Sequence, residues 1–141
     1  MHDTETTIVT EEQKQALLEA ACQARELAHA PYSRFKVGSA ILTADGRMFT
    51  GVNVENASYG LSICAERTAV FSAVTAGAKL IVAVAVCTIN AAAPCGACRQ
   101  VLGEFGGDIP VWLTDPAGNV RQTSLHTLLP DHFSPGDLPG A

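Results

Sequence analysis

The sequence lacks a long hydrophobic run and lacks an excess of positive charge, and each absence excludes a class of protein. No window of eighteen consecutive residues is apolar, so we expect no membrane-spanning helix and no membrane partner. The 14 acidic residues outnumber the 9 lysines and arginines, which gives a formal net charge of −5. Tight binding of a polynucleotide needs a basic surface that displaces counterions. We therefore expect no polynucleotide partner, whereas a small neutral ligand is compatible with this charge.

The opening segment MHDTETTIVTEEQK also lacks the basic start and apolar centre of a signal peptide. We therefore expect a cytoplasmic chain whose cysteines stay reduced. The five cysteines are Cys22, Cys64, Cys87, Cys95 and Cys98. An odd number fits a disulfide framework poorly, so metal ligation or buried thiols are the better interpretations.

Charged side chains are scarce, at 16% against 48% hydrophobic residues. A subunit interface would account for this, and so would a composition rich in alanine and glycine. The 141 residues suffice for one compact domain and not for two ordinary ones. We predict a single domain over residues 1–141 with flexible ends at 1–9 and 134–141.

Apolar spacing and turn signals predict helices alternating with strands. Thr10 and Gln13 form a capping box for a first helix that ends near His29, before Pro31. The Asp45-Gly46 turn predicts a hairpin of strands 37–43 and 47–54. The remaining expected elements are helix 64–76, a buried strand 80–88 covered on both faces, helix 95–105, strands 109–114 and 120–123, and a short helix 124–129. This order predicts an α/β fold, a three-layer α/β/α sandwich around a mixed, about five-stranded sheet with the hairpin at its antiparallel edge.

Three cysteines fall at the starts of two predicted helices. Cys95 and Cys98 form a C-x-x-C at one helix start, and Cys64 opens the other. Helix N-termini favour anions and lower thiol pKa values. A catalytic zinc site uses three protein ligands and keeps one position open for water. The pattern predicts such a site, with Arg67 and Arg99 near enough to hydrogen-bond the sulfurs.

Glu66 follows Cys64 by two residues, so its side chain leaves the helix at a different angle and can face the open position without binding the ion. A metal ion lowers the pKa of bound water to about 7, and a nearby carboxylate can then carry the proton. Two other interpretations stay open. Cys95 and Cys98 could form a thioredoxin-type redox pair, or a structural zinc site could take Cys22, Cys87 or a histidine as fourth ligand.

Cys64-Ala65-Glu66 together with PCGACRQ (94–100) resembles the signature of zinc-dependent deaminases that use three cysteines. PYSRFKVG (31–38) and NVENA (53–57) extend the resemblance to small-subunit cytidine deaminases, over roughly residues 10–133. The resemblance implies one Zn²⁺ per chain, bound by Cys64, Cys95 and Cys98. It implies that Glu66 shuttles a proton to N3 of a pyrimidine and then to the leaving amine.

The resemblance also implies a nucleoside site. Asn53 and Glu55 would bond the ribose hydroxyls, and residues two apart on a strand do face the same side. Phe35 would line the base pocket, and Ala65 would offer a backbone group to the base. Arg67 would bond ligand sulfurs. Tyr59 lies in a segment that the family uses at subunit contacts, and Phe133 matches an aromatic residue that reaches a neighbouring subunit's site in a homotetramer.

The implied activity is zinc-dependent hydrolytic deamination of cytidine and deoxycytidine to uridine and deoxyuridine, with release of ammonia, in pyrimidine salvage. One alternative is a deaminase of a related aminopyrimidine such as blasticidin S, although Asn53 and Glu55 favour a ribose. Another is a non-catalytic, zinc-stabilised binding protein, which would need a fourth protein ligand.

Overall fold

The computed structural model describes residues 8–140 of the chain. Most of the predicted flexible segment 1–9, together with residue 141, lies outside this range. Residues 134–140 contain a short helix, η2 (Pro135–Asp137), where the Ser134 amide donates to the Asp137 carboxylate. The flexibility of both ends stays a prediction.

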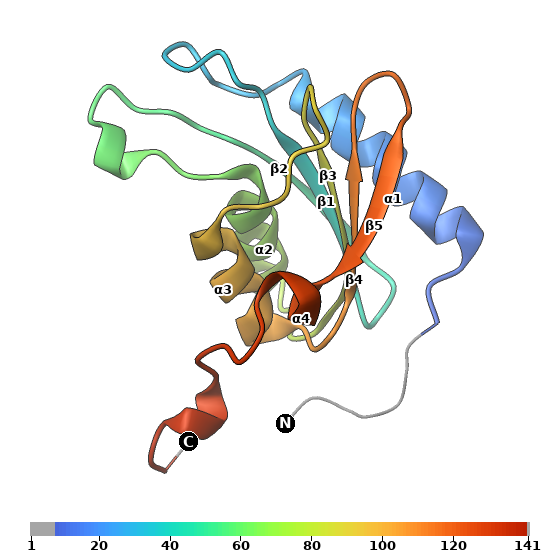
Figure 1. Ribbon diagram of the computed structural model, residues 1–141, viewed down its shortest axis with the longest axis vertical. Helices are drawn as coiled ribbons and strands as arrows, with labels where there is room; N and C mark the ends of the chain where they lie inside the picture. The colour runs from blue at the N-terminus through green and yellow to red at the C-terminus, as the bar shows by residue number, and fades with distance from the viewer. Residues whose placement is uncertain (1–7, 141) are drawn as a thin grey trace.

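A five-stranded sheet forms the centre of the fold, in the order β2-β1-β3-β4-β5 (Figure 1). Its strands are β1 (Gly38–Thr43), β2 (Met48–Val52), β3 (Ile81–Cys87), β4 (Pro110–Thr114) and β5 (Val120–Ser124). Only β3 and β4 pair in parallel, while the other neighbours are antiparallel. The predicted mixed sheet with the hairpin at one edge is therefore confirmed.

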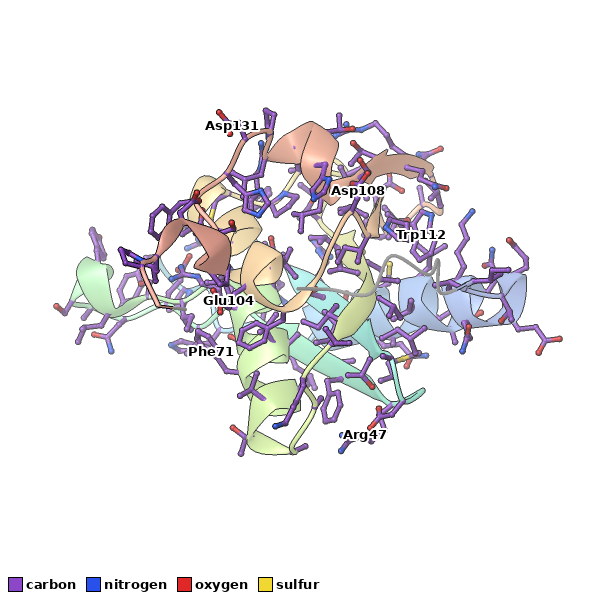
Figure 2. The ribbon with its side chains drawn as sticks, turned by 90° about the horizontal axis from the view of Figure 1, so that it is seen from below. Arg47, Phe71, Glu104, Asp108, Trp112 and Asp131 are labelled. Carbon is purple, nitrogen blue, oxygen red and sulfur yellow. The ribbon has the colours of Figure 1, made fainter. Side chains whose placement is uncertain are left out.

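Helices cover both faces of this sheet. Helix α1 (Glu11–Arg25) packs on one face, and α2 (Ala65–Thr75) and α3 (Gly96–Phe105) pack on the other (Figure 1). In Figure 2, Phe71 and Glu104 project from the layer of α2 and α3, and Trp112 lies towards α1. The short helix α4 (Leu125–Leu128) follows β5. This arrangement is the predicted three-layer sandwich.

Strand β3 shows why the sheet needs both layers. Val84 and Val86 join the core under α2 and α3, while Ala83, Ala85 and Cys87 join the core under α1. Side chains alternate between the two faces of a strand, and here both sets are buried. A continuous apolar run is the sequence signature of such a strand.

Gly51 allows α2 to start close to the sheet. A Cβ atom at this position would collide with the backbone of Ala65 and Ala69. Ala65 is the first residue of α2 and directly follows Cys64. The missing side chain in β2 therefore sets the position of the helix that carries Cys64 and Glu66.

The first helix ends earlier than predicted, at Arg25 and not near His29. The His29 amide donates to the Asn53 carbonyl over 3.0 Å, and the Glu55 amide donates to the His29 carbonyl over 2.8 Å. This bridge to residues after β2 holds His29 in an extended conformation, which cannot continue a helix. The same bridge brings Glu55 beside the loop that follows α1.

Within residues 8–140, none of the helices combines the length and the apolar character needed to cross a lipid bilayer.

Candidate active site

The N-termini of α2 and α3 bring three cysteine sulfurs together. Cys64 is the N-cap of α2, Cys95 is the N-cap of α3, and Cys98 lies in the first turn of α3. The Cys64 and Cys95 Sγ atoms are 3.7 Å apart, and those of Cys95 and Cys98 are 3.5 Å apart. Neither N-cap thiol hydrogen-bonds the backbone of its helix, so both sulfurs are free to face an ion.

The spacing of these sulfurs fits a zinc ion. Tetrahedral coordination at Zn–S distances of about 2.3 Å separates two sulfurs by about 3.8 Å. All three Sγ atoms lie within 4.8 Å of one another, and within residues 8–140 the cluster contains no fourth Cys, His, Asp or Glu. Cys22 and Cys87, the cysteines considered as a fourth ligand, lie elsewhere. Three thiolate ligands leave one coordination position open, as a catalytic site requires.

The charge on the sulfurs is stabilised locally. The hydrogen bond from Cys98, with further bonds from Arg67 and Cys95, lowers the pKa of the Cys64 thiol to about 5. The pKa of the Cys98 thiol is raised, first by its hydrogen bond to Cys64 and then by burial. The Arg67 Nη2 atom donates to Cys64 Sγ over 3.5 Å. An arginine beside a thiolate cluster offsets part of the negative charge that a dication leaves uncompensated.

The prediction that Arg99 also bonds a sulfur is wrong. Its Nε atom donates to the Pro94 carbonyl over 2.8 Å, and its Nη1 atom donates to the Leu128 carbonyl over 2.7 Å. Arg99 therefore ties the loop before α3 to the end of α4. Its contribution is to hold the backbone that presents Cys95.

Glu66 is the second residue of α2 and lies beside the sulfur cluster. Only 3% of its surface is exposed to solvent. Burial, reinforced by the negative charge on Cys64, raises the pKa of its carboxyl to about 7. A carboxyl with a raised pKa takes up a proton more readily than an exposed glutamate does. It can therefore accept a proton in one step and return it in another. Ala65, beside it, is fully buried.

Asn53 holds the segment that carries Phe35. Its Oδ1 atom accepts from the Val37 amide over 2.9 Å, and its Nδ2 atom donates to the Phe35 carbonyl over 2.8 Å. Sequence reasoning places Asn53 at a ribose but does not find this brace. The bonded partners lie 16 and 18 residues earlier, so no local pattern reports them.

Glu55 holds the start of the same segment. Its carboxylate accepts from the Tyr32 amide over 2.9 Å, from the Ser33 amide over 3.1 Å and from the Ser33 hydroxyl. The Ser33 hydroxyl, followed by these amides, lowers the pKa of Glu55. The Phe35 amide donates in turn to the Ser33 oxygen over 3.0 Å.

Ser33 is therefore a site residue that sequence reasoning missed. Its signal is local, because a serine oxygen that accepts from the amide two residues on is a recognised turn motif. Arg34, the next residue, has a positive φ of 59°, a strained conformation that these bonds around it stabilise.

The predicted aromatic site residues all reach the surface. Phe35 is 38% exposed, and Tyr59 stands in the short helix η1 (Tyr59–Leu61) with its ring edge-on to Tyr32 at 5.7 Å. Phe133 is exposed, and its carbonyl accepts from Gln100 Nε2 over 2.7 Å. A shallow pocket lies between the loop after α1 and the segment around η1. It is lined by Tyr32, Ser33, Glu55, Tyr59 and Ser62. The substrate-contact roles of these residues stay predictions.

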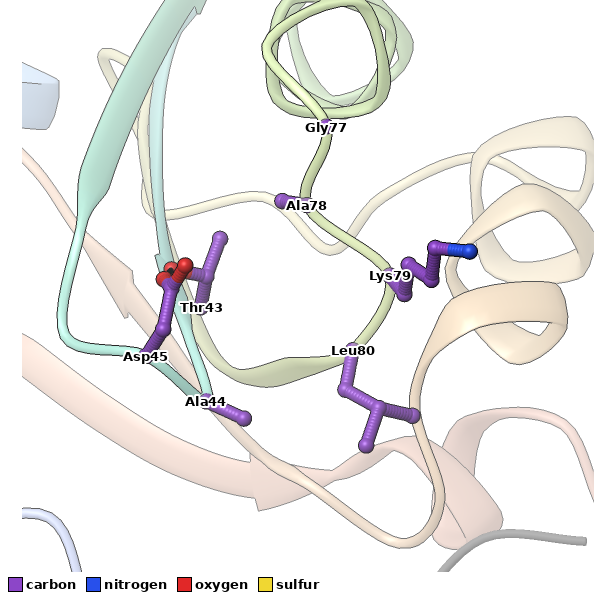
Figure 3. A pocket seen from close by; sticks show the side chains of 7 residues that line it. All are labelled: Thr43, Ala44, Asp45, Gly77, Ala78, Lys79 and Leu80. Atoms are coloured by element: carbon purple, nitrogen blue, oxygen red, sulfur yellow. Dashed lines mark hydrogen bonds between the residues drawn. The ribbon is translucent and has the colours of Figure 1, made fainter.

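A second hollow lies at the opposite end of α2 (Figure 3). It is lined by Thr43, Ala44, Asp45, Gly77, Ala78, Lys79 and Leu80. The 11 residues of α2, at about 1.5 Å per residue, separate it from Cys64 by roughly 16 Å. Lys79 points away from Asp45 there (Figure 3). None of the cysteines of the sulfur cluster, nor Glu66, lines this hollow.

Comparison with known proteins identifies the family of this fold and site. The family described as cytidine and deoxycytidylate deaminase zinc-binding region matches residues 11–113. The chain belongs to this zinc-binding deaminase family, which confirms the resemblance seen in the sequence.

Individual relatives support the same assignment. A cytidine deaminase from Halalkalibacterium halodurans is 47% identical over 128 residues, covering 89% of this chain and 97% of that protein. A probable cytidine deaminase from Dictyostelium discoideum is 45% identical over 133 residues, covering 92% of this chain and 90% of that protein. The crystal structure of cytidine deaminase from Burkholderia pseudomallei superposes with a TM-score of 0.81 at 55% identity, covering 89% of this chain and 100% of the other. The predicted fold class is confirmed.

Proposed function

We propose that this chain catalyses the hydrolytic deamination of cytidine and deoxycytidine to uridine and deoxyuridine, with release of ammonia. The observation that carries the proposal is the buried Glu66 carboxyl, with its pKa raised to about 7, beside three sulfurs spaced for one zinc ion. The relatives named as cytidine deaminases support the same chemistry.

Cys64, Cys95 and Cys98 would hold the zinc ion, which would supply Lewis acidity and lower the pKa of a bound water to about 7. Glu66 accepts the proton that water loses as it adds to C4 of the pyrimidine, and delivers it to N3. It then moves a second proton from the new hydroxyl to the exocyclic nitrogen, which leaves as ammonia. Burial of Glu66 suits both transfers, because burial raises the pKa of the carboxyl above its ordinary value and makes the protonated form easier to reach.

A ribose is the best candidate for the rest of the substrate. The Glu55 carboxylate already accepts three hydrogen bonds from Tyr32 and Ser33, and a carboxylate offers about four acceptor sites. One acceptor position is left for a hydroxyl. The Asn53 oxygen accepts one bond from Val37 and keeps a second lone pair. Both residues can therefore brace the loop and still contact a sugar, with Phe35 against the base and Ala65 offering its backbone.

A homotetramer with sites at subunit contacts is the proposed assembly. Large apolar side chains are exposed near the site and along α2, including those of Tyr59, Leu61, Phe71 and Phe133. A shallow apolar pocket lined by Val54, Ile63, Thr68, Phe71, Ser72 and Thr75 continues this surface. In such an assembly Tyr59 and Phe133 would lie at subunit contacts, with Phe133 reaching a neighbouring site. We also propose a role in pyrimidine salvage in the cytoplasm, which a nucleoside substrate would suit.

The test is a spectrophotometric assay of the zinc-loaded protein with cytidine, deoxycytidine and blasticidin S in parallel. We expect loss of ultraviolet absorbance with both nucleosides, a far slower reaction with the antibiotic, and loss of activity after treatment with a chelator. Faster turnover of blasticidin S would favour the aminopyrimidine alternative. No absorbance change with any of the three at full zinc occupancy would favour the non-catalytic one.

A further inference from the structure

Two cysteines that the zinc cluster does not use lie against each other on the other face of the sheet. Cys22 belongs to α1, and Cys87 is the last residue of β3. Their Sγ atoms are 2.6 Å apart, although the two residues are separated by 65 positions in the sequence. Both pack in the core between α1 and the sheet. Neither belongs to the Cys64, Cys95 and Cys98 cluster.

We propose that Cys22 and Cys87 are a redox-active dithiol that closes reversibly into a disulfide joining α1 to β3. A disulfide bond is about 2.05 Å long, so the separation of the two sulfurs, 2.6 Å, has to shrink by only about half an ångström. Both cysteines stand on regular elements that are packed together, which keeps the two thiols facing each other. The sequence provides no signal for this pair, because the contact is between distant segments.

The surroundings of the two thiols set the order of the reaction. Cys87 has no exposed surface, and burial, with the adjacent Cys22, raises the pKa of its thiol to about 12. Cys22 is partly exposed, so an external oxidant reaches it first. The remaining polar contact of Cys22 is a long hydrogen bond of 3.9 Å to the Asp115 carbonyl, which does not block access.

A low-molecular-weight disulfide such as oxidised glutathione is the oxidant that fits this geometry. The Cys22 thiolate attacks one sulfur of oxidised glutathione. The disulfide bond of glutathione breaks, and one glutathione leaves as a thiol while the other stays bonded to Cys22 Sγ. The Cys87 sulfur then attacks Cys22 Sγ, loses its proton, and displaces the second small thiol. Two protein thiols are oxidised by two electrons to one disulfide, and the small disulfide is reduced to two thiols.

Closure of the pair would stiffen the two segments that continue from α1 and β3. Cys87 leads through residues 88–94 to Cys95. At the end of α1, the Arg25 Nε atom donates to the Lys36 carbonyl over 3.1 Å, in the loop that carries Phe35. A covalent link between α1 and β3 also closes a long loop and restricts the unfolded chain. We therefore expect the oxidised form to unfold at a higher temperature.

Peptide mapping of the zinc-loaded, full-length protein tests the proposal. The protein is incubated with excess oxidised glutathione, free thiols are blocked with N-ethylmaleimide under denaturing conditions, and the chain is cut with trypsin. Cleavage after Lys14, Arg25, Lys79 and Arg99 puts Cys22 in peptide 15–25 and Cys87 in peptide 80–99. We expect these two peptides to be joined, with Cys95 and Cys98 blocked by the reagent and the link assigned to Cys87 by fragmentation.

Cys22→Ser and Cys87→Ser are matched controls, and each should abolish the cross-link. Oxidation should raise the thermal midpoint of the wild-type protein by about 5 °C and leave both variants unchanged. Glutathione retained on Cys22 with Cys87 fully blocked by the reagent would overturn the proposal, as would a link from Cys22 to Cys95 or Cys98. Full blocking of both thiols would also overturn it. If the serine variants do not fold, the wild-type map still decides. The readout is the cross-link and not activity, so a negative result here is distinguishable from a negative result in the deaminase assay.

Discussion

The side-chain amide of Asn53 bonds the backbone of Phe35 and, on its other side, that of Val37. One residue after β2 therefore fixes the segment that carries the predicted base-contacting ring. Asn53 is 9% exposed, so these bonds replace water that the buried amide and the two backbone groups would otherwise need. The proposed nucleoside site is in this way organised before any substrate arrives.

Asn53→Ala should weaken substrate binding by releasing this segment. The change leaves the part-buried Val37 amide and Phe35 carbonyl without their partners, at a cost of at most about 1–3 kcal/mol each. We expect KM for cytidine to rise about tenfold or more, because both the brace and the proposed ribose contact are lost. Steady-state kinetics and a denaturation curve measure the two effects. Asn119→Ala, in the turn after β4, is the control, and an equal rise in KM there would contradict the account.

Arg67→Ala should lower zinc affinity by about 10–100-fold, because Arg67 donates to Cys64 Sγ and offsets the charge of the sulfur cluster. A competition titration with a zinc-binding dye measures this change without reference to activity. Arg47→Ala removes an arginine of the β1–β2 turn, where the side chain bonds Asp45 and the Ala76 carbonyl, and should leave zinc affinity unchanged (Figure 2). Unaltered zinc affinity in Arg67→Ala would show that its bond to Cys64 contributes nothing to metal binding.

Gly51→Ala should destabilise the fold and disturb the site together. The added methyl group would meet the backbone of Ala65 and Ala69, so β2 or α2 has to move. We expect a loss of about 1–3 kcal/mol in the free energy of unfolding, together with weaker zinc binding, because Cys64 precedes Ala65. Urea denaturation and zinc titration test this. At Gly60, where an added Cβ has open space, the same substitution should change neither quantity.

Acid should weaken the β1–β2 turn through Asp45. Hydrogen bonds from the Arg47 guanidinium and the Thr43 hydroxyl hold the pKa of Asp45 at about 2, below its ordinary value of 3.8. A lowered folded-state pKa stabilises the fold fully above the unfolded value, and the contribution is lost as the pH falls through about 4 to 2. The urea midpoint of the wild-type protein should therefore exceed that of Asp45→Asn at pH 6, and the two should converge near pH 2. A constant difference across this range would contradict the assignment to Asp45.

Local signals explain what the sequence predicts well. The Asp45-Gly46 turn, the apolar run of β3 and the cysteines at two helix starts each depend on neighbouring residues, and their elements form as expected. The three metal ligands are predicted for the same reason, since helix starts favour thiolates. The end of α1 is mispredicted because the His29 backbone pairs with Asn53 and Glu55, far along the chain.

Long-range choices explain what the sequence could not reveal. Arg99 has two backbone carbonyls within reach and bonds those rather than a sulfur. Asn53 and Glu55 stand out in the sequence as polar residues two positions apart, but their bonds to the loop depend on where that loop passes. The contact between Cys22 and Cys87 likewise follows from the packing of α1 on β3.

The most direct test of the central claim is turnover of cytidine by Glu66→Gln at measured zinc occupancy. Glutamine keeps the size and polarity of the side chain but cannot take up and return a proton. General acid–base catalysis contributes about 10²–10⁴-fold, so the account predicts a fall in kcat of at least this size with zinc still bound at one ion per chain. Glu104→Gln, on the exposed surface of α3, should retain wild-type activity (Figure 2). Near wild-type kcat in Glu66→Gln at full zinc occupancy would contradict the assignment of Glu66 as the proton carrier.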